Sequence, residues 1–214
     1  MNSRLGTGLE FTPDNLYREE RNGYRNGEAK LFLDEAMLAA PLRWRKPRMI
    51  FVCSMTDLFA EFVPDAWIDR LFAVMALCPQ HIFQVLTKRS GRQKRYLAAR
   101  SGLGNADLCK AINDIPSPLG NRHGALEMPL PNVWVGVSIE DRRAIGRLLD
   151  LLETPAAKRF VSCEPLLGPL NLTHIDLPGG YSEIFPLAGY TPAPGEISGD
   201  GGPCKPQPRL DCVI

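Results

Sequence analysis

Cysteine is absent from the first 52 residues of this 214-residue chain, and the six cysteines that follow form no C-x-x-C pair. This scatter excludes a zinc ribbon, a thioredoxin-like motif and a compact disulfide framework, and it is typical of a reduced cytoplasmic protein. The three histidines lie far apart and have no i, i+4 partner, so they predict no zinc site either. No metal site is therefore expected.

Net charge and long apolar runs are also lacking. The chain has 25 Lys and Arg residues against 24 Asp and Glu residues, so no overall field attracts it to nucleic acid or to anionic lipid. No apolar run approaches the ~18 residues that span a bilayer, and the N-terminus has no signal-peptide core. The expectation is a soluble cytoplasmic protein without a membrane partner, in which any contact with a polyanion is local.

Familiar catalytic motifs are missing as well. There is no Gly-rich phosphate loop, no G-x-S-x-G elbow and no HExxH helix, so the sequence names no catalytic residue and no reaction. What is present is a repeated plan of short apolar, β-rich segments that each end in polar or charged residues. These segments are residues 49–57, 82–89, 133–140 and 158–169.

Helical patterns separate several of these segments. Between the first two, apolar residues recur at intervals of three to four from Trp67 to Cys78, which places them on one face of a helix. A strand, a helix and a strand within about 40 residues indicate a parallel crossover. A second strong helix is predicted over residues 141–153. Alternating parallel strands and helices favour an α/β fold, either a (β/α) barrel or an open doubly wound sheet.

The composition divides the chain into four parts. A polar N-terminal segment covers residues 1–27, and the strands and helices fall within residues 28–172. Residues 173–209 are rich in Pro and Gly without periodicity, and they cannot bury enough surface to offset the entropy of ordering. They are predicted to form a surface insertion. Residues 210–214 look like the start of a further strand.

Ligands collect at the carboxyl ends of the strands in both candidate architectures. The candidates for a substrate or cofactor pocket at those ends are Ser54, Asp57, Thr87, Lys88, Arg89, Ser138, Glu140, Ser162 and Glu164. Carboxylates there could orient a substrate, transfer a proton or hold an ammonium group, and the basic residues could meet a carboxylate or phosphate. Asp57 and Ser138 could instead be helix caps. Glu164 is less easily explained in that way, because no obvious helix begins after it.

A basic run on the predicted helix after the second strand has two interpretations. Its members are Lys88, Arg89, Arg92, Lys94, Arg95 and Arg100. They could contact nucleic acid, with Tyr96 as a stacking residue, but a solvated helix face is the commoner explanation when net charge is near zero.

Six motifs in consistent order resemble a phage- and prophage-associated family of unknown function. They are YRNG (24–27), PLRWRKP (41–47), IFVCSMTDLF (50–59), FQVLTKR (83–89), NVWVGVSIE (132–140) and RFVSCEPLLGP (159–169). Full-length members of that family look like radical S-adenosylmethionine (radical SAM) proteins. The resemblance implies a partial or full TIM-like (β/α) barrel of parallel strands, truncated at both ends and interrupted by the Pro/Gly-rich insertion.

This chain departs from the family pattern at both ends. Members usually carry three cysteines upstream of the YRNG segment, whose thiolates would hold a [4Fe-4S] cluster with one iron open to S-adenosylmethionine. Members also continue past the last strand into a further strand and helix. The resemblance thus implies a chain without a cofactor of its own and without catalytic activity. Its substrate would be an unknown small molecule or macromolecule, and the alternative is a non-catalytic module that binds nucleic acid or a partner protein.

Overall fold

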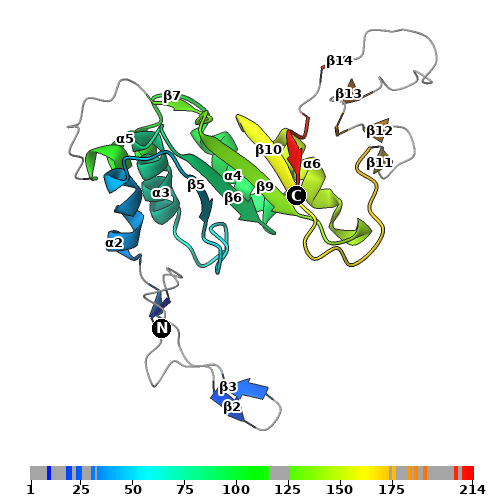
Figure 1. Cartoon of the computed structure of the whole chain (residues 1–214), viewed down its shortest axis with the longest axis horizontal. Coiled ribbons are helices and arrows are strands. Elements are labelled where there is room, and N and C mark those ends of the chain that lie inside the picture. The colour runs from blue at the N-terminus through cyan, green and yellow to red at the C-terminus, as the bar shows by residue number, and fades with distance from the viewer. Residues whose placement is uncertain are drawn as a thin grey trace.

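A five-stranded parallel sheet forms the centre of the protein in the computed structural model (Figure 1). The model describes residues 33–115, 126–173 and 209–214, together with short segments before and after them. The order of strands across the sheet is β15-β10-β9-β6-β5. Their bounds are Met49–Val52 for β5, Ile82–Thr87 for β6, Val133–Ser138 for β9, Lys158–Ser162 for β10 and Cys212–Val213 for β15.

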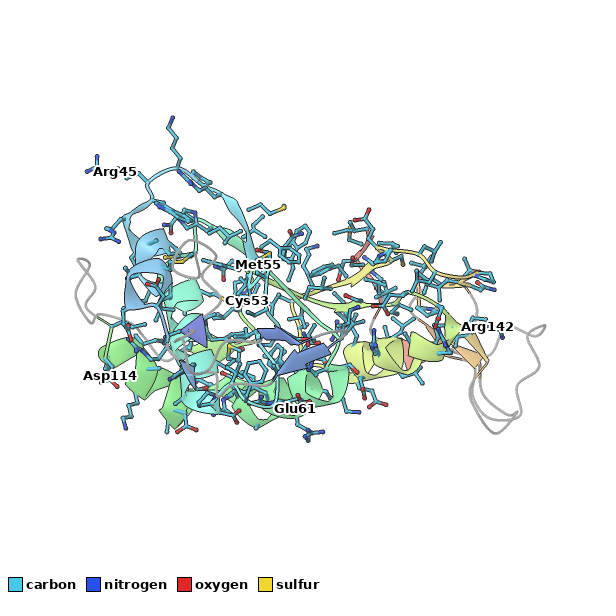
Figure 2. The ribbon with its side chains drawn as sticks, turned by 90° about the horizontal axis from the view of Figure 1, so that it is seen from below. Arg45, Cys53, Met55, Glu61, Asp114 and Arg142 are labelled. Atoms are coloured by element: carbon cyan, nitrogen blue, oxygen red, sulfur yellow. The ribbon has the colours of Figure 1, made fainter. Side chains whose placement is uncertain are left out.

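Helices connect successive strands and lie along one side of the sheet, as the view in Figure 2 shows. Helix α3 links β5 to β6, α4 and α5 link β6 to β9, and α6 links β9 to β10. The helices are α2 (Glu35–Leu38), η1 (Ala40–Arg43), α3 (Asp65–Leu77), α4 (Ser90–Arg100), α5 (Ala106–Asn113), η2 (Arg142–Ala144) and α6 (Gly146–Glu153). None of the described helices is long and apolar enough to cross a bilayer.

Among the described residues, five further pairs of short strands are antiparallel. They are β1 (Leu9–Glu10) with β4 (Lys30–Leu31), β2 (Arg18–Glu20) with β3 (Gly23–Arg25), β7 (Gly102–Leu103) with β8 (Glu127–Met128), β11 (Ile175–Asp176) with β12 (Glu183–Ile184), and β13 (Tyr190–Thr191) with β14 (Lys205–Pro206). Most of residues 1–27 and of the Pro/Gly-rich tract 173–209 lie outside the described residues.

The core fills the layer between the sheet and its helices. Phe83 and Val85 of β6 are buried, and they pair in register with the buried Val133 and Val135 of β9. Side chains alternate between the two faces of a strand, so these residues form rows on the helix-covered face. The apolar faces of α3, α4 and α6 complete the same buried cluster.

The opposite face of the sheet is less protected at its β5 end, where Met49 and Phe51 are 57% and 45% exposed. Near the centre of this face the ring of Phe160 lies directly over Gly136. A Cβ atom added to Gly136 would come within 2.5 Å of that ring, so this position requires glycine.

The parallel α/β architecture is confirmed, but the sheet is not closed into a barrel. Among the described residues β5 and β15 form its two edges, and each strand lies beside the strand that precedes it. A TIM barrel closes with eight tilted strands, and five are too few to complete that circle. Residues 210–214 contain β15, which pairs in parallel with β10.

Candidate functional site

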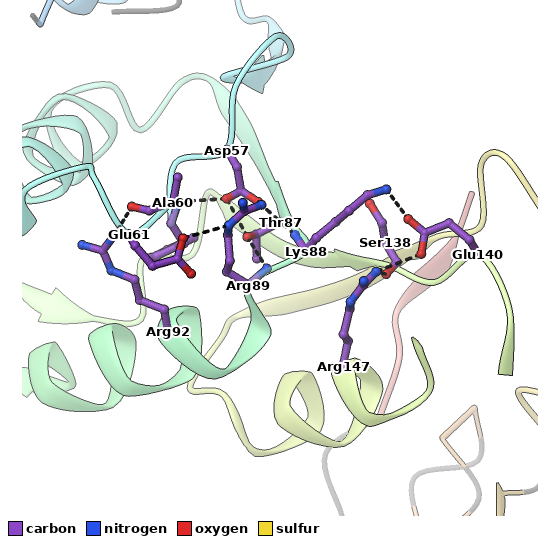
Figure 3. Close-up of polar contacts among 11 residues, drawn as sticks. Asp57, Ala60, Glu61, Thr87, Lys88, Arg89, Arg92, Ser138, Glu140 and Arg147 are labelled. Atoms are coloured by element: carbon purple, nitrogen blue, oxygen red, sulfur yellow. Dashed lines mark hydrogen bonds and ion pairs between the residues drawn. The ribbon is translucent and has the colours of Figure 1, made fainter. Parts of the chain in front are cut away.

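Charged side chains gather where β5, β6 and β9 end, and they form two neighbouring networks (Figure 3). This is the carboxyl edge of the sheet, where the sequence analysis placed its candidates. The first network is centred on Asp57 and the second on Glu140. Lys88 joins them, because its backbone contacts Asp57 and its side chain contacts Glu140.

Asp57 ties the end of β5 to the end of β6. Its Oδ1 accepts hydrogen bonds from the Phe59 amide at 2.9 Å and the Thr87 hydroxyl at 2.6 Å. Its Oδ2 accepts from the Lys88 amide and the Arg89 guanidinium, both at 3.1 Å. Four donors occupy the acceptor sites that a carboxylate offers. Asp57 therefore holds the two strand ends together and is not a helix cap, because the N-cap of α3 is Pro64.

Glu140, which follows β9, lies between two cations. Lys88 forms an ion pair with Oε1, and Arg147 donates to Oε2 at 2.8 Å. The hydrogen bond from Lys88, assisted by Arg147, holds the pKa of Glu140 below its ordinary value, so this side chain is a carboxylate at neutral pH. Arg147 also donates to the Ser138 carbonyl at 2.7 Å, which fixes its guanidinium beside the end of β9.

A hollow of about 360 Å³ lies beside Glu140, and we call it the strand-edge pocket. It is lined by Lys88, Glu140, Asp141, Arg143, Ala144, Arg147, Pro165 and Leu167. The loop after β10 provides its apolar side and is held in place by a hydrogen bond of 2.8 Å from the Leu167 amide to the Glu140 carbonyl. Three lining side chains are cations and two are carboxylates, which leaves a local charge of +1.

Six of the candidate residues belong to this carboxyl-edge arrangement. They are Asp57, Thr87, Lys88, Arg89, Ser138 and Glu140. Ser162 pairs in register with Ser138, and its carbonyl accepts the Ile139 amide at 2.8 Å. Ser54 and Glu164 are exposed and do not line the pocket. Pro165 and Leu167 occupy the wall where Glu164 was expected.

Sequence reasoning missed Arg143 and Arg147, which supply two of the three cations. Both lie in the helical segment that follows β9. The signal was present in the topology, because the first turn of a helix that follows a parallel strand remains near the carboxyl edge of the sheet. Looking for basic residues within the first turn after each strand would have found them.

The described residues do not fit the iron–sulfur cluster that the resemblance implies for full-length members of the family. They contain no group of three or more His, Cys, Asp or Glu side chains placed to hold a metal ion. Cys53 follows β5 and Cys163 follows β10. These strands are three strand spacings apart in the sheet, ~14 Å, so the two thiols do not meet at one cluster.

Sequence comparison assigns the chain to a family but not to an activity. Comparisons with curated proteins and with solved structures find no match. A family model described as "Protein of unknown function (DUF5131)" matches residues 11–188, which is well over half of the chain. The chain therefore belongs to the DUF5131 family of proteins of unknown function.

Proposed function

We propose that the protein binds a small organic anion, a carboxylate or phosphate with an apolar part, in the strand-edge pocket. The observation that supports this most directly is the excess of cations over carboxylates around a hollow large enough for a small ligand. The apolar side formed by Pro165 and Leu167 suits the apolar part of such a ligand. The position also agrees with the general rule that ligands of parallel α/β sheets bind outside the carboxyl ends of the strands.

The cations retain donors for a ligand. Among the described residues Arg147 uses only Nη1, for the Ser138 carbonyl and Glu140, which leaves the N–H groups on Nε and Nη2. The side chain of Arg143 is 89% exposed. Within the described residues its Nε and Nη2 donate to Asp141, which leaves the N–H groups on Nη1 for a ligand. A guanidinium presents its donors in a planar fork that matches a carboxylate or phosphate.

Glu140 is an example of the carboxylate group that these cations bind. Its carboxylate bridges Lys88 and Arg147. A ligand anion would bind to the N–H groups of the same cations that Glu140 does not occupy. Arg143, on the segment between Glu140 and Arg147, would then provide the adaptable contact.

Binding can be tested with phenyl phosphate and inorganic phosphate by isothermal titration calorimetry. We expect Arg143→Gln and Lys88→Gln each to weaken binding of phenyl phosphate about fivefold, which corresponds to roughly 1 kcal/mol for one exposed charge contact. The matched control is Arg142→Gln, because Arg142 is the adjacent exposed arginine and does not line the pocket. The proposal fails if the wild-type protein binds neither compound, or if the control weakens binding as much.

We further propose that this protein resembles a radical SAM barrel only in its sheet and strand ends, and that its own residues hold no [4Fe-4S] cluster. The support is the donor set, in which no three thiolates converge within the described part of the chain. Anaerobic reconstitution with iron and sulfide should give no stable absorption band of a 4-iron cluster. A stoichiometric cluster would overturn this proposal and would make radical chemistry the leading function.

The alternative of a nucleic-acid interface on α4 has less support, because carboxylates pair with its basic side chains. Arg89 contacts Asp57 and Glu61, Arg92 contacts Asp65, Lys94 contacts Asp150 and Glu153, and Arg100 contacts Asp69. These pairs remove most of the local field that would attract a polyanion. Titration of labelled DNA at about 50 mM salt should therefore show no binding, whereas binding that weakens steeply with salt would favour this alternative.

A further inference from the structure

A second hollow lies at the β5 edge of the sheet and shares no lining residue with the strand-edge pocket. Its volume is about 250 Å³, and we call it the β5 cavity. Its walls come from α2, η1, β5, the turn after β5, α3 and Phe83 of β6. The side chains that determine its character are Met37, Trp44, Phe51, Phe62, Trp67 and Met75.

The β5 cavity offers no cationic side chain to a ligand. No Lys, Arg or His lines it, and its two charged residues, Asp34 and Asp57, are carboxylates. Asp34 caps α2 and accepts the Met37 amide at 3.0 Å. Asp57 accepts the four donors described above. An anion would lose hydration without gaining a cationic partner, so the cavity disfavours anions.

The volume and the lining of the β5 cavity indicate the size and the chemical character of that ligand. A dry apolar cavity of about 150 Å³ is known to hold one benzene molecule. The β5 cavity is larger, and five aromatic rings line it. Aromatic rings attract one another in offset-stacked and edge-to-face arrangements, and the two methionines can adapt to an irregular outline.

A strained turn brings polar groups to the wall of the β5 cavity. Cys53 has a φ of 55°, a left-handed conformation that a residue with a side chain rarely adopts. The turn is closed by a hydrogen bond of 3.0 Å from the Thr56 amide to the Cys53 carbonyl, and both residues line the cavity. Strain of this kind persists where surrounding structure imposes it, often at ligand sites. Burial raises the pKa of the Cys53 thiol, which therefore remains neutral.

We infer that the β5 cavity binds a flat aromatic compound of one or two fused rings that carries no anionic group. The aromatic walls hold the rings, and the thiol and hydroxyl of Cys53 and Thr56 accommodate a single polar substituent. This site is separate from the proposed anion site, and it does not depend on that proposal.

The test uses 2-naphthol and decahydro-2-naphthol, which share a carbon skeleton and a hydroxyl group and differ in aromaticity. Binding to the full chain is measured by isothermal titration calorimetry and by quenching of the tryptophan fluorescence. Because the walls are aromatic, we expect 2-naphthol to bind and the saturated compound, which is not flat, to bind at least tenfold more weakly. Absence of 2-naphthol binding, or equal affinity for the two compounds, would overturn the inference.

Two substitutions that fill the cavity make the location testable. Val63→Phe and Leu71→Phe both add volume to side chains that line it, and each should abolish 2-naphthol binding. The matched control is Leu103→Phe, because Leu103 is 70% exposed and does not line the cavity. Circular dichroism establishes that each variant is folded. Unchanged affinity in a folded filled variant would refute the site. If neither variant folds, the comparison of the two compounds on the wild-type protein decides.

Discussion

Replacing Asp69 with alanine should destabilise the protein more than almost any other single polar substitution. Asp69 of α3 is only 6% exposed, and Arg100 at the end of α4 is 8% exposed. Arg100 donates to both carboxylate oxygens of Asp69, through Nε at 2.7 Å and Nη2 at 3.1 Å. The Tyr96 hydroxyl donates to the same carboxylate at 2.6 Å. This triad joins the two helices beneath the sheet.

The expected magnitude follows from what remains after the substitution. Asp69→Ala leaves the Arg100 guanidinium buried without its carboxylate, and breaking a buried pair in this way costs about 3–5 kcal/mol. Tyr96→Phe is a milder change, because it removes one hydrogen bond and keeps the ring that stacks on Arg100 at 4.0 Å. We expect that variant to lose only about 1 kcal/mol, because Oδ1 of Asp69 still accepts a hydrogen bond from Arg100 Nε.

A double substitution separates the cost of losing the ion pair from the cost of leaving Arg100 buried without a partner. In Asp69→Ala combined with Arg100→Met the buried positive charge is gone, so the double variant should be more stable than Asp69→Ala alone. Urea unfolding followed by circular dichroism gives the free energy of unfolding for each protein. The reasoning is refuted if Asp69→Ala costs no more than Tyr96→Phe, or if removing the Arg100 charge as well costs additional stability.

Three other predictions follow from single contacts. Asn132 donates through Nδ2 to three carbonyls, at 3.0, 3.1 and 3.2 Å, at and beyond the end of α3. Asn132→Asp should lower the urea midpoint more than Asn132→Ala, because the aspartate carboxylate would face three carbonyl oxygens and could donate to none of them. Gly136→Ala should cost about 1–3 kcal/mol by overpacking against the Phe160 ring, and adding Phe160→Leu should recover part of that loss in thermal unfolding. Because the folded-state pKa of Glu140 is lowered, its contribution to stability is present above its unfolded pKa and is lost as pH falls through the folded value; Glu140→Gln should therefore flatten the acid side of a plot of stability against pH, and an unchanged slope would contradict this.

The strands and helices of the core could be predicted because their signals are local. The apolar positions of α3 recur at helical spacing between Pro64 and Pro79, and the structure places the helix over Asp65–Leu77. The four apolar strands were found for the same reason, since each ends in polar residues. Whether the sheet closes could not be predicted, because closure depends on which strands form the edges and on their tilt, and neither leaves a periodic signal.

The carboxyl edge was predicted only in part, for a physical reason. The rule that parallel strands deliver their last residues to one edge brought Asp57 and Lys88 into the candidate set, and they do meet there. The same rule says nothing about the direction of a loop after its first residue. Glu164 therefore looked equivalent to Glu140 in the sequence, although one is exposed and the other is 9% exposed and paired.

The basic run on α4 shows how a charge pattern should be weighed in this fold. Lys94 pairs with Asp150 and Glu153, which lie 56 and 59 positions away in the sequence, so no local window reveals its partners. The near-zero net charge already indicated that most cations would find carboxylates. Against that background, the strand-edge pocket is informative because its cations outnumber its carboxylates and because Arg147 keeps unused donors among the described residues. We therefore expect an anion to gain more at this pocket than along α4, where carboxylates already pair with most of the basic side chains.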